Sequence, residues 1–173
     1  MHRRPNPFWR YSLARYRDPA VAAACLALQD RWGADVNVLL YCCWIGQRGR
    51  ALNKRALRAV DTAVRTLQIE VIRPLRQARR TLRQPPDGVP RAWARQLKNR
   101  IAAVELDLEY IEHRMLLTAT KQLPMTKRRW TARAAIDRNL TGYLTLLGVP
   151  ATHADRRRAT TLLSACVALG GTE

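Results

Sequence analysis

Residues 18–44, DPAVAAACLALQDRWGADVNVLLYCCW, contain two predicted helices and the turn between them. Asp18 followed by Pro19 predicts a helix start, because aspartate caps the first turn and proline fits the first helical position. Gly33 is placed to end this helix, and Asp35 can cap the next one. The second helix is apolar on most sides, which predicts that Val36 and the residues after it form the buried centre of a helical protein.

The middle of the chain predicts a long helical hairpin. Its first arm has apolar residues at steps of three and four: Leu57, Val60, Val64, Leu67, Val71, Leu75, Ala78 and Leu82. A turn rich in Pro and Gly follows at 84–90. The second arm repeats the pattern at Trp93, Leu97, Ile101, Val104, Leu108, Ile111 and Met115. This spacing is close to a heptad seam, so the arms should pack antiparallel along it, with a kink at Pro74.

The whole pattern predicts an all-α fold of six or seven helices built around this hairpin. We expect one domain over residues 1–173, since this length suits a single hydrophobic core. Its parts are the N-terminal helices at 1–53, the hairpin at 54–123 and a C-terminal helix pair at 124–173. No alternating strand pattern interrupts them.

The N-terminal third contains a set of chemically different residues in a characteristic order. The set consists of Phe8-Trp9, Leu13, Tyr16, Asp18-Pro19, Cys25-Leu26, Leu28-Gln29-Asp30, Gly33, Asp35-Val36-Asn37, Leu39-Leu40 and Trp44. This order resembles the N-terminal signature of a bacterial family of short, all-helical proteins of unknown function. The resemblance covers about the first third of the chain. It implies a helical fold and transfers no catalytic residue.

The chain is strongly basic, with 31 Lys and Arg against 13 Asp and Glu, a net charge of +18. The excess is spread along the chain, so the folded surface itself should be positive. Such a surface favours polyanions, which include nucleic acid, anionic lipid and an acidic protein partner. Alternatively, the positive charge has no binding role. Nearly all the basic residues are Arg, and a high Arg content can follow from the base composition of a genome.

The cysteines and the N-terminus indicate a cytoplasmic protein. Four cysteines lie in apolar stretches without a C-x-x-C motif, which predicts free thiols in a reducing compartment. The N-terminal segment lacks an apolar signal core, and the longest apolar run, Val38 to Ile45, is too short to be a transmembrane segment.

Two basic triplets are the sharpest local feature. They are Lys127, Arg128 and Arg129, and Arg156, Arg157 and Arg158. Both are expected in or near the first turn of a helix, where cations oppose the helix dipole unless an anion binds there. The triplets are therefore a candidate anion-binding site, and the alternative is solvated charge.

Four polar residues flank the two N-terminal helices: Gln29, Asp30, Asp35 and Asn37. In one interpretation they line a small, otherwise apolar ligand pocket in the N-terminal third. In the other, Asp35 caps its helix while the remaining three close hydrogen bonds at the Gly33 turn.

The sequence lacks the motifs that mark most enzyme active sites and metal sites. Glu105, Asp107, Glu109 and Glu112 lie close together, but no Glu-x-x-His motif accompanies them. We therefore expect these acids to pair with arginines of the facing arm: Arg58, Arg65, Arg73 and Arg76. The chain also lacks an Asp-rich magnesium motif, a Gly-rich phosphate loop and a Gly-x-Ser-x-Gly elbow. We expect no cofactor, and a binding protein for nucleic acid or another polyanion rather than an enzyme. The alternative is a ligand-binding or assembly factor that uses the N-terminal pocket.

Overall fold

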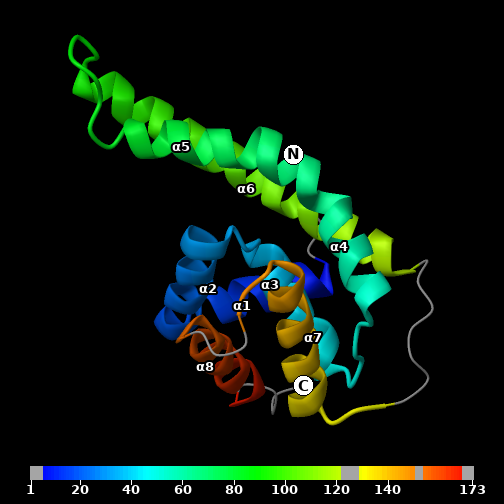
Figure 1. Ribbon diagram of the computed structural model, residues 1–173. Coiled ribbons are helices and arrows are strands. Elements are labelled where there is room, and N and C mark those ends of the chain that lie inside the picture. Colours follow the sequence, from blue (N-terminus) through cyan, green and yellow to red (C-terminus); the bar gives the residue numbers. More distant parts are fainter. Residues whose placement is uncertain (1–5, 122–128, 151–153, 169–173) are drawn as a thin grey trace.

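The computed structural model, which describes residues 6–121, 129–150 and 154–168, is built of helices joined by short turns (Figure 1). The elements are α1 (Pro7–Tyr16), α2 (Pro19–Trp32), α3 (Val36–Gln47), α4 (Lys54–Leu67), the π-helical turn η1 (Gln68–Ile72), α5 (Arg73–Thr81), α6 (Arg91–Lys121), α7 (Ala132–Leu146) and α8 (Ala154–Ala168). Because α4, η1 and α5 are continuous, they count as one helix, and the described residues then contain seven. The predicted all-α fold is confirmed.

The N-terminal helices begin and end where their side chains predict. The Asp18 carboxylate accepts a hydrogen bond from the Ala20 backbone N–H at 2.8 Å. Gly33 ends α2 with φ 66°, a left-handed conformation that glycine adopts without strain. The Asp35 carboxylate accepts from the Asn37 N–H at 2.8 Å and so caps α3. These caps set the tight turn that places α2 beside α3.

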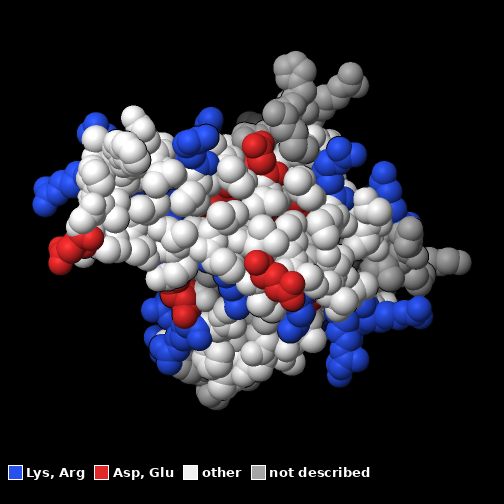
Figure 2. All heavy atoms as spheres, turned by 90° about the horizontal axis from the view of Figure 1, so that it is seen from above, with Lys and Arg blue, Asp and Glu red and all other residues white. Residues whose placement is uncertain are grey.

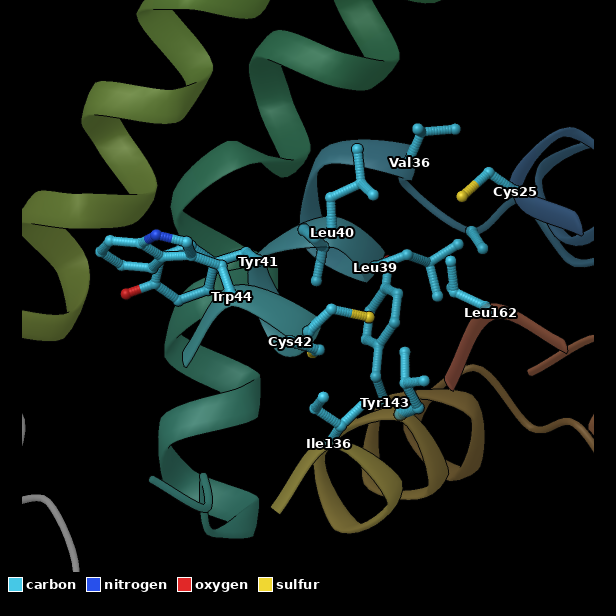
Figure 3. Close-up of a cluster of buried hydrophobic side chains, with 14 of the residues drawn as sticks. Cys25, Val36, Leu39, Leu40, Tyr41, Cys42, Trp44, Ile136, Tyr143 and Leu162 are labelled. Carbon is cyan, nitrogen blue, oxygen red and sulfur yellow. The ribbon is translucent and has the colours of Figure 1, made fainter. Parts of the chain in front are cut away.

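Helix α3 is the buried centre, as its composition predicts. Every residue from Val36 to Gly46 is buried. Figure 3 shows its side chains packed among Cys25 of α2, Ile136 and Tyr143 of α7, and Leu162 of α8. We call the bundle of α1, α2, α3, α7 and α8 the head.

Helix α7 packs closely against α3. A Cβ placed at Gly46 would lie 2.7 Å from the Ile136 backbone, so only glycine permits this crossing. The fully buried Asn139 side chain fixes the loop after α3. It accepts from the Leu52 N–H at 2.7 Å and donates to the carbonyls of Cys42 at 3.0 Å and Arg50 at 3.1 Å.

The predicted antiparallel hairpin is also confirmed: α4, η1 and α5 run against α6, and the far end of the pair projects beyond the head (Figure 1). The first arm bends between α4 and α5. Within η1, the Arg73 N–H donates to the Gln68 carbonyl five residues earlier, and Pro74 follows without an N–H to donate. A π turn next to a proline accounts for such a bend.

The predicted heptad seam is buried only near the head. Leu57, Val60 and Val64 are buried in α4, but in α6 Trp93 is 68% and Val104 48% exposed. The covered face of α6 instead carries residues such as Ala94, Glu105 and Glu112. The seam prediction was therefore wrong for the distal hairpin, because the spacing defines a helix face without identifying the neighbour that covers it.

Candidate functional site

A network of buried polar side chains lies where α3, η1 and α6 meet. We call Asp35, Asn37, Gln68, Glu112 and His113 the polar network; none of them is more than 6% exposed. The first two come from the start of α3, Gln68 from the π turn, and the last two from α6. Because buried polar groups are costly without partners, their hydrogen bonds hold the hairpin on the head.

The hydrogen bonds of the network form a chain. The Asn37 amide donates to Glu112 Oε2 at 2.6 Å, and Asn37 Oδ1 lies 2.9 Å from His113 Nε2. The Gln68 amide donates to Asp35 Oδ2 at 2.7 Å and lies 3.4 Å from Glu112 Oε1. On the other side of Asp35, its backbone N–H donates to the Tyr143 hydroxyl at 3.0 Å.

Two members of the network have displaced protonation equilibria. Burial, together with the nearby Asp35 carboxylate, raises the pKa of Glu112 well above its usual value. Burial lowers the pKa of His113 to about 4, so its imidazole is neutral near pH 7. Phe8 stacks on this imidazole with ring centroids 4.2 Å apart, and Trp9 meets it edge-on at 5.1 Å. The network thus contains a carboxyl with a raised pKa beside an imidazole that is neutral near pH 7.

A cavity of about 280 Å³ opens beside the polar network, between the first three helices and the hairpin. Its lining residues are Trp9, Ser12, Leu13, Tyr16, Leu26, Gln29, Val36, Asn37, Leu40, Arg76, Arg79, Arg80, Glu105, Leu106, Glu109 and His113. Leu13, Tyr16 and Leu26 are each partly exposed and form apolar parts of its rim.

The hairpin wall of the cavity consists of ion pairs. Arg79 contacts both oxygens of Glu105, at 2.6 and 3.1 Å, and Arg76 donates to Glu109 at 2.8 Å. The expected pairing with Arg76 is thus confirmed for Glu109 at 2.8 Å and for Glu105 at 3.9 Å, but the closer partner of Glu105 is Arg79, which was not predicted. The expected pairing with an arginine was wrong for Glu112, whose carboxyl is fully buried and faces amides instead.

The four residues predicted to surround a pocket separate into different roles. Gln29 and Asn37 line the cavity. Asp35 is the helix cap and a member of the polar network. Asp30 lies on the surface, 3.4 Å from the Arg80 guanidinium. The sequence did not indicate Gln68, Glu112 or His113 for this site. They are more than 30 residues away from the predicted pocket residues in the chain, and only the fold brings them together.

The comparisons with known proteins concern the same part of the chain. The sequence model of a family described as "Protein of unknown function (DUF2390)" matches residues 7–116, more than half of the chain. The chain belongs to this family. No curated protein and no solved structure matches it. The DUF2390 match extends from the N-terminal third through most of α6, and so contains the polar network and every residue that lines the cavity.

In this DUF2390 protein, Arg129 is the one described residue of the first basic triplet, and it precedes helix α7. Helix α7 begins at Ala132, because the Thr131 hydroxyl caps it by accepting from the Ala134 N–H. Arg129 therefore lies outside the helix and is exposed. Lys127 and Arg128 lie outside the described residues.

The second triplet lies in the first turns of α8, which begins at Ala154. Arg157 and Arg158 are exposed, and the side chain of Arg156 lies outside the described part of the structure.

The hairpin tip, residues 82–100, is a second basic region. It contains one acid, Asp87, and five cations: Arg83, Arg91, Arg95, Lys98 and Arg100. None of the five forms an ion pair with a described residue. Four of these cations border a hollow of about 690 Å³ at the turn. Basic side chains protrude at this end of the molecule, on the left of Figure 2.

Other site types are not indicated within the described ranges. No group of three or more His, Cys, Asp or Glu side chains there could hold a metal ion, and no helix is long and apolar enough to cross a membrane. The four cysteines are free and buried, as predicted.

Proposed function

We propose that this DUF2390 protein binds single-stranded nucleic acid through its hairpin tip. The observation that carries the proposal is a group of five cations with no acidic partner among the described residues, on a projecting hairpin that also exposes a tryptophan. Such cations attract phosphates, and their binding releases counterions from the nucleic acid.

The distribution of ion pairs along the hairpin favours the tip over its base. Near the head, Arg76 and Arg79 are neutralised by Glu105 and Glu109. Between residues 82 and 104, which form the part of the hairpin farther from the head, the one acidic residue is Asp87. The far end of the hairpin, which projects from the head (Figure 1), therefore carries its cations away from the acids that pair with Arg76 and Arg79.

Trp93 favours a single strand over a duplex. Its side chain is 68% exposed, and Leu97 and Arg100 follow it on the same face of α6, four and seven residues later. Unpaired bases stack on exposed aromatic rings while basic side chains follow the backbone. The basic triplets at 127–129 and 156–158 are candidates for additional phosphate contacts.

The proposal is tested by fluorescence anisotropy with a labelled oligothymidylate over a range of salt concentrations. Wild-type protein should bind at low salt, and log affinity should fall with log salt by about 0.7 for each phosphate contact. Trp93→Ala should weaken binding by about 5-fold to about 150-fold with little change in this slope, because the ring carries no charge. Trp93→Phe should restore much of the affinity.

Leu97→Ala is the matched control, since Leu97 is exposed on the same helix face but has no ring for a base. It should bind like the wild type. Absence of binding at low salt would refute the proposal and favour the compositional origin of the charge. Unchanged binding by Trp93→Ala would refute base stacking at the tip.

A further inference from the structure

Two residues that line the cavity beside the polar network each have a buried side-chain atom without a hydrogen-bond partner among the described residues. These atoms are Ser12 Oγ and His113 Nδ1. Ser12 is 5% and His113 1% exposed, and both residues line the cavity. A buried polar atom without a partner is costly, so a molecule that satisfies both atoms would gain affinity from that contact.

The hydrogen-bonding role of His113 Nδ1 follows from its neighbours. The Asn37 amide nitrogen donates to Glu112, so Asn37 Oδ1 must be the acceptor for His113 Nε2. The imidazole therefore has its proton on Nε2 in its neutral form. Nδ1 then offers a lone pair, and its partner has to be a donor.

Ser12 complements this acceptor, because its hydroxyl can donate as well as accept. A hydroxyl group on a ligand could donate to His113 Nδ1 and accept from Ser12 Oγ. The two residues come from different helices, α1 and α6, but both are neighbours of Trp9. Ser12 follows Trp9 by about one helical turn, and the Trp9 ring lies 5.1 Å from the His113 imidazole.

The remaining walls favour an uncharged, largely apolar ligand. Trp9, Leu13, Val36 and Leu40 are among the apolar residues that form them. The charges of the hairpin wall are already paired within the protein, so neither sign is in excess there. A volume of about 280 Å³ is close to the lower limit of ligand pockets, about 300 Å³, and suits one or two rings.

We propose that this cavity binds a small, uncharged aromatic molecule whose hydroxyl group bonds to His113 Nδ1 and Ser12 Oγ. This site is separate from the hairpin tip and does not depend on nucleic-acid binding. It extends the predicted N-terminal pocket by assigning the recognition to residues of α1 and α6.

Phenol and anisole are the probes. Both have one oxygen attached to a benzene ring, but only the phenol hydroxyl can donate a hydrogen bond. Ligand-observed NMR and calorimetry on the full chain should give a dissociation constant for phenol of about 1 mM or tighter. Anisole should bind roughly 3-fold to 10-fold more weakly, which corresponds to one hydrogen bond.

Two variants separate the two contacts. Ser12→Ala should weaken phenol and anisole alike, because either oxygen accepts from Ser12. His113→Phe should weaken phenol and remove its advantage over anisole. Leu97→Ala on the distal hairpin is the control and should change neither affinity.

Equal binding of phenol and anisole by the wild type would overturn the proposal, as would undetectable binding of phenol at several millimolar. Unchanged phenol binding by Ser12→Ala would also overturn it. If His113→Phe does not fold, as judged by circular dichroism, the probe ratio in the wild type and the effect of Ser12→Ala still decide the outcome.

Discussion

Glu112→Gln tests the protonation of the polar network, because an amide can reproduce the hydrogen bonds of a protonated carboxyl. The Glu112 carboxyl accepts from the Asn37 amide at 2.6 Å, and in its protonated form it can donate to the neighbouring Asp35 carboxylate. A glutamine can accept from Asn37 through its oxygen and donate to Asp35 through its nitrogen. The loss is confined to the 3.4 Å contact from Gln68. Below pH 4, the variant should therefore match the wild type within about 1 kcal/mol.

The difference between the two proteins should grow as pH rises. Burial raises the pKa of Glu112 in the folded protein, so the folded state keeps a proton that the unfolded state releases near its ordinary pKa of about 4.3. The wild type loses stability above that pH, by up to about 1.4 kcal/mol per pH unit, whereas the glutamine variant does not. Between pH 5 and pH 7, the variant should gain up to about 2.7 kcal/mol relative to the wild type.

Urea unfolding followed by far-UV circular dichroism at pH 5, 6 and 7 measures this difference. Titration of His113 acts in the opposite direction, because its lowered pKa costs stability as pH falls below about 6.5, but it is common to both proteins and cancels. Glu70→Gln, at an exposed position in η1, controls for the loss of one carboxylate from the chain. A difference that is constant with pH, or that favours the wild type at pH 7, would refute a protonated Glu112.

Three further predictions concern the core. Leu40→Ala should lower the free energy of unfolding by about 2–5 kcal/mol, since Leu40 is 2% exposed at the centre of α3; urea unfolding measures it, and a change below about 0.5 kcal/mol would show that α3 is peripheral. Asn139→Ala should cost about 3 kcal/mol by the same assay, because two buried backbone groups and one partly buried carbonyl lose their partner, and a cost below about 1 kcal/mol would contradict these bonds. A thiol reagent should label the four buried cysteines of native protein only as fast as it unfolds, so immediate labelling of any one would contradict their burial.

Local chemistry made much of the fold predictable. Asp18, Gly33 and Asp35 act within one turn of their own positions, so the sequence contains the whole cause of each helix boundary. The burial of α3 was predictable for a similar reason, because no side of that helix is polar enough to face water. Thr131 is a local signal that was missed, and it places the start of α7 after the basic triplet.

Contacts across the chain were not predictable from periodicity. The bond between Asn37 and Glu112 joins residues 75 positions apart and depends on where α6 crosses α3. The π turn inserts an extra residue into the helical register and buries Gln68. The proline at position 74 indicated a bend but not which side chain the bend would turn inward. The heptad spacing likewise predicted burial for Trp93, which the distal hairpin leaves exposed.

The most direct test of the proposed function compares two variants that lose the same charge. The tip variant replaces five cations with Gln: Arg83, Arg91, Arg95, Lys98 and Arg100. The control variant replaces five exposed cations elsewhere: Arg10, Arg17, Lys54, Arg55 and Arg133. Oligothymidylate affinity is measured against salt for both. The tip variant should bind far more weakly, with a slope of log affinity against log salt that is shallower by up to about 3.5, while the control stays near the wild type. Equal losses in the two variants would show that binding follows total charge, and would contradict a site at the hairpin tip.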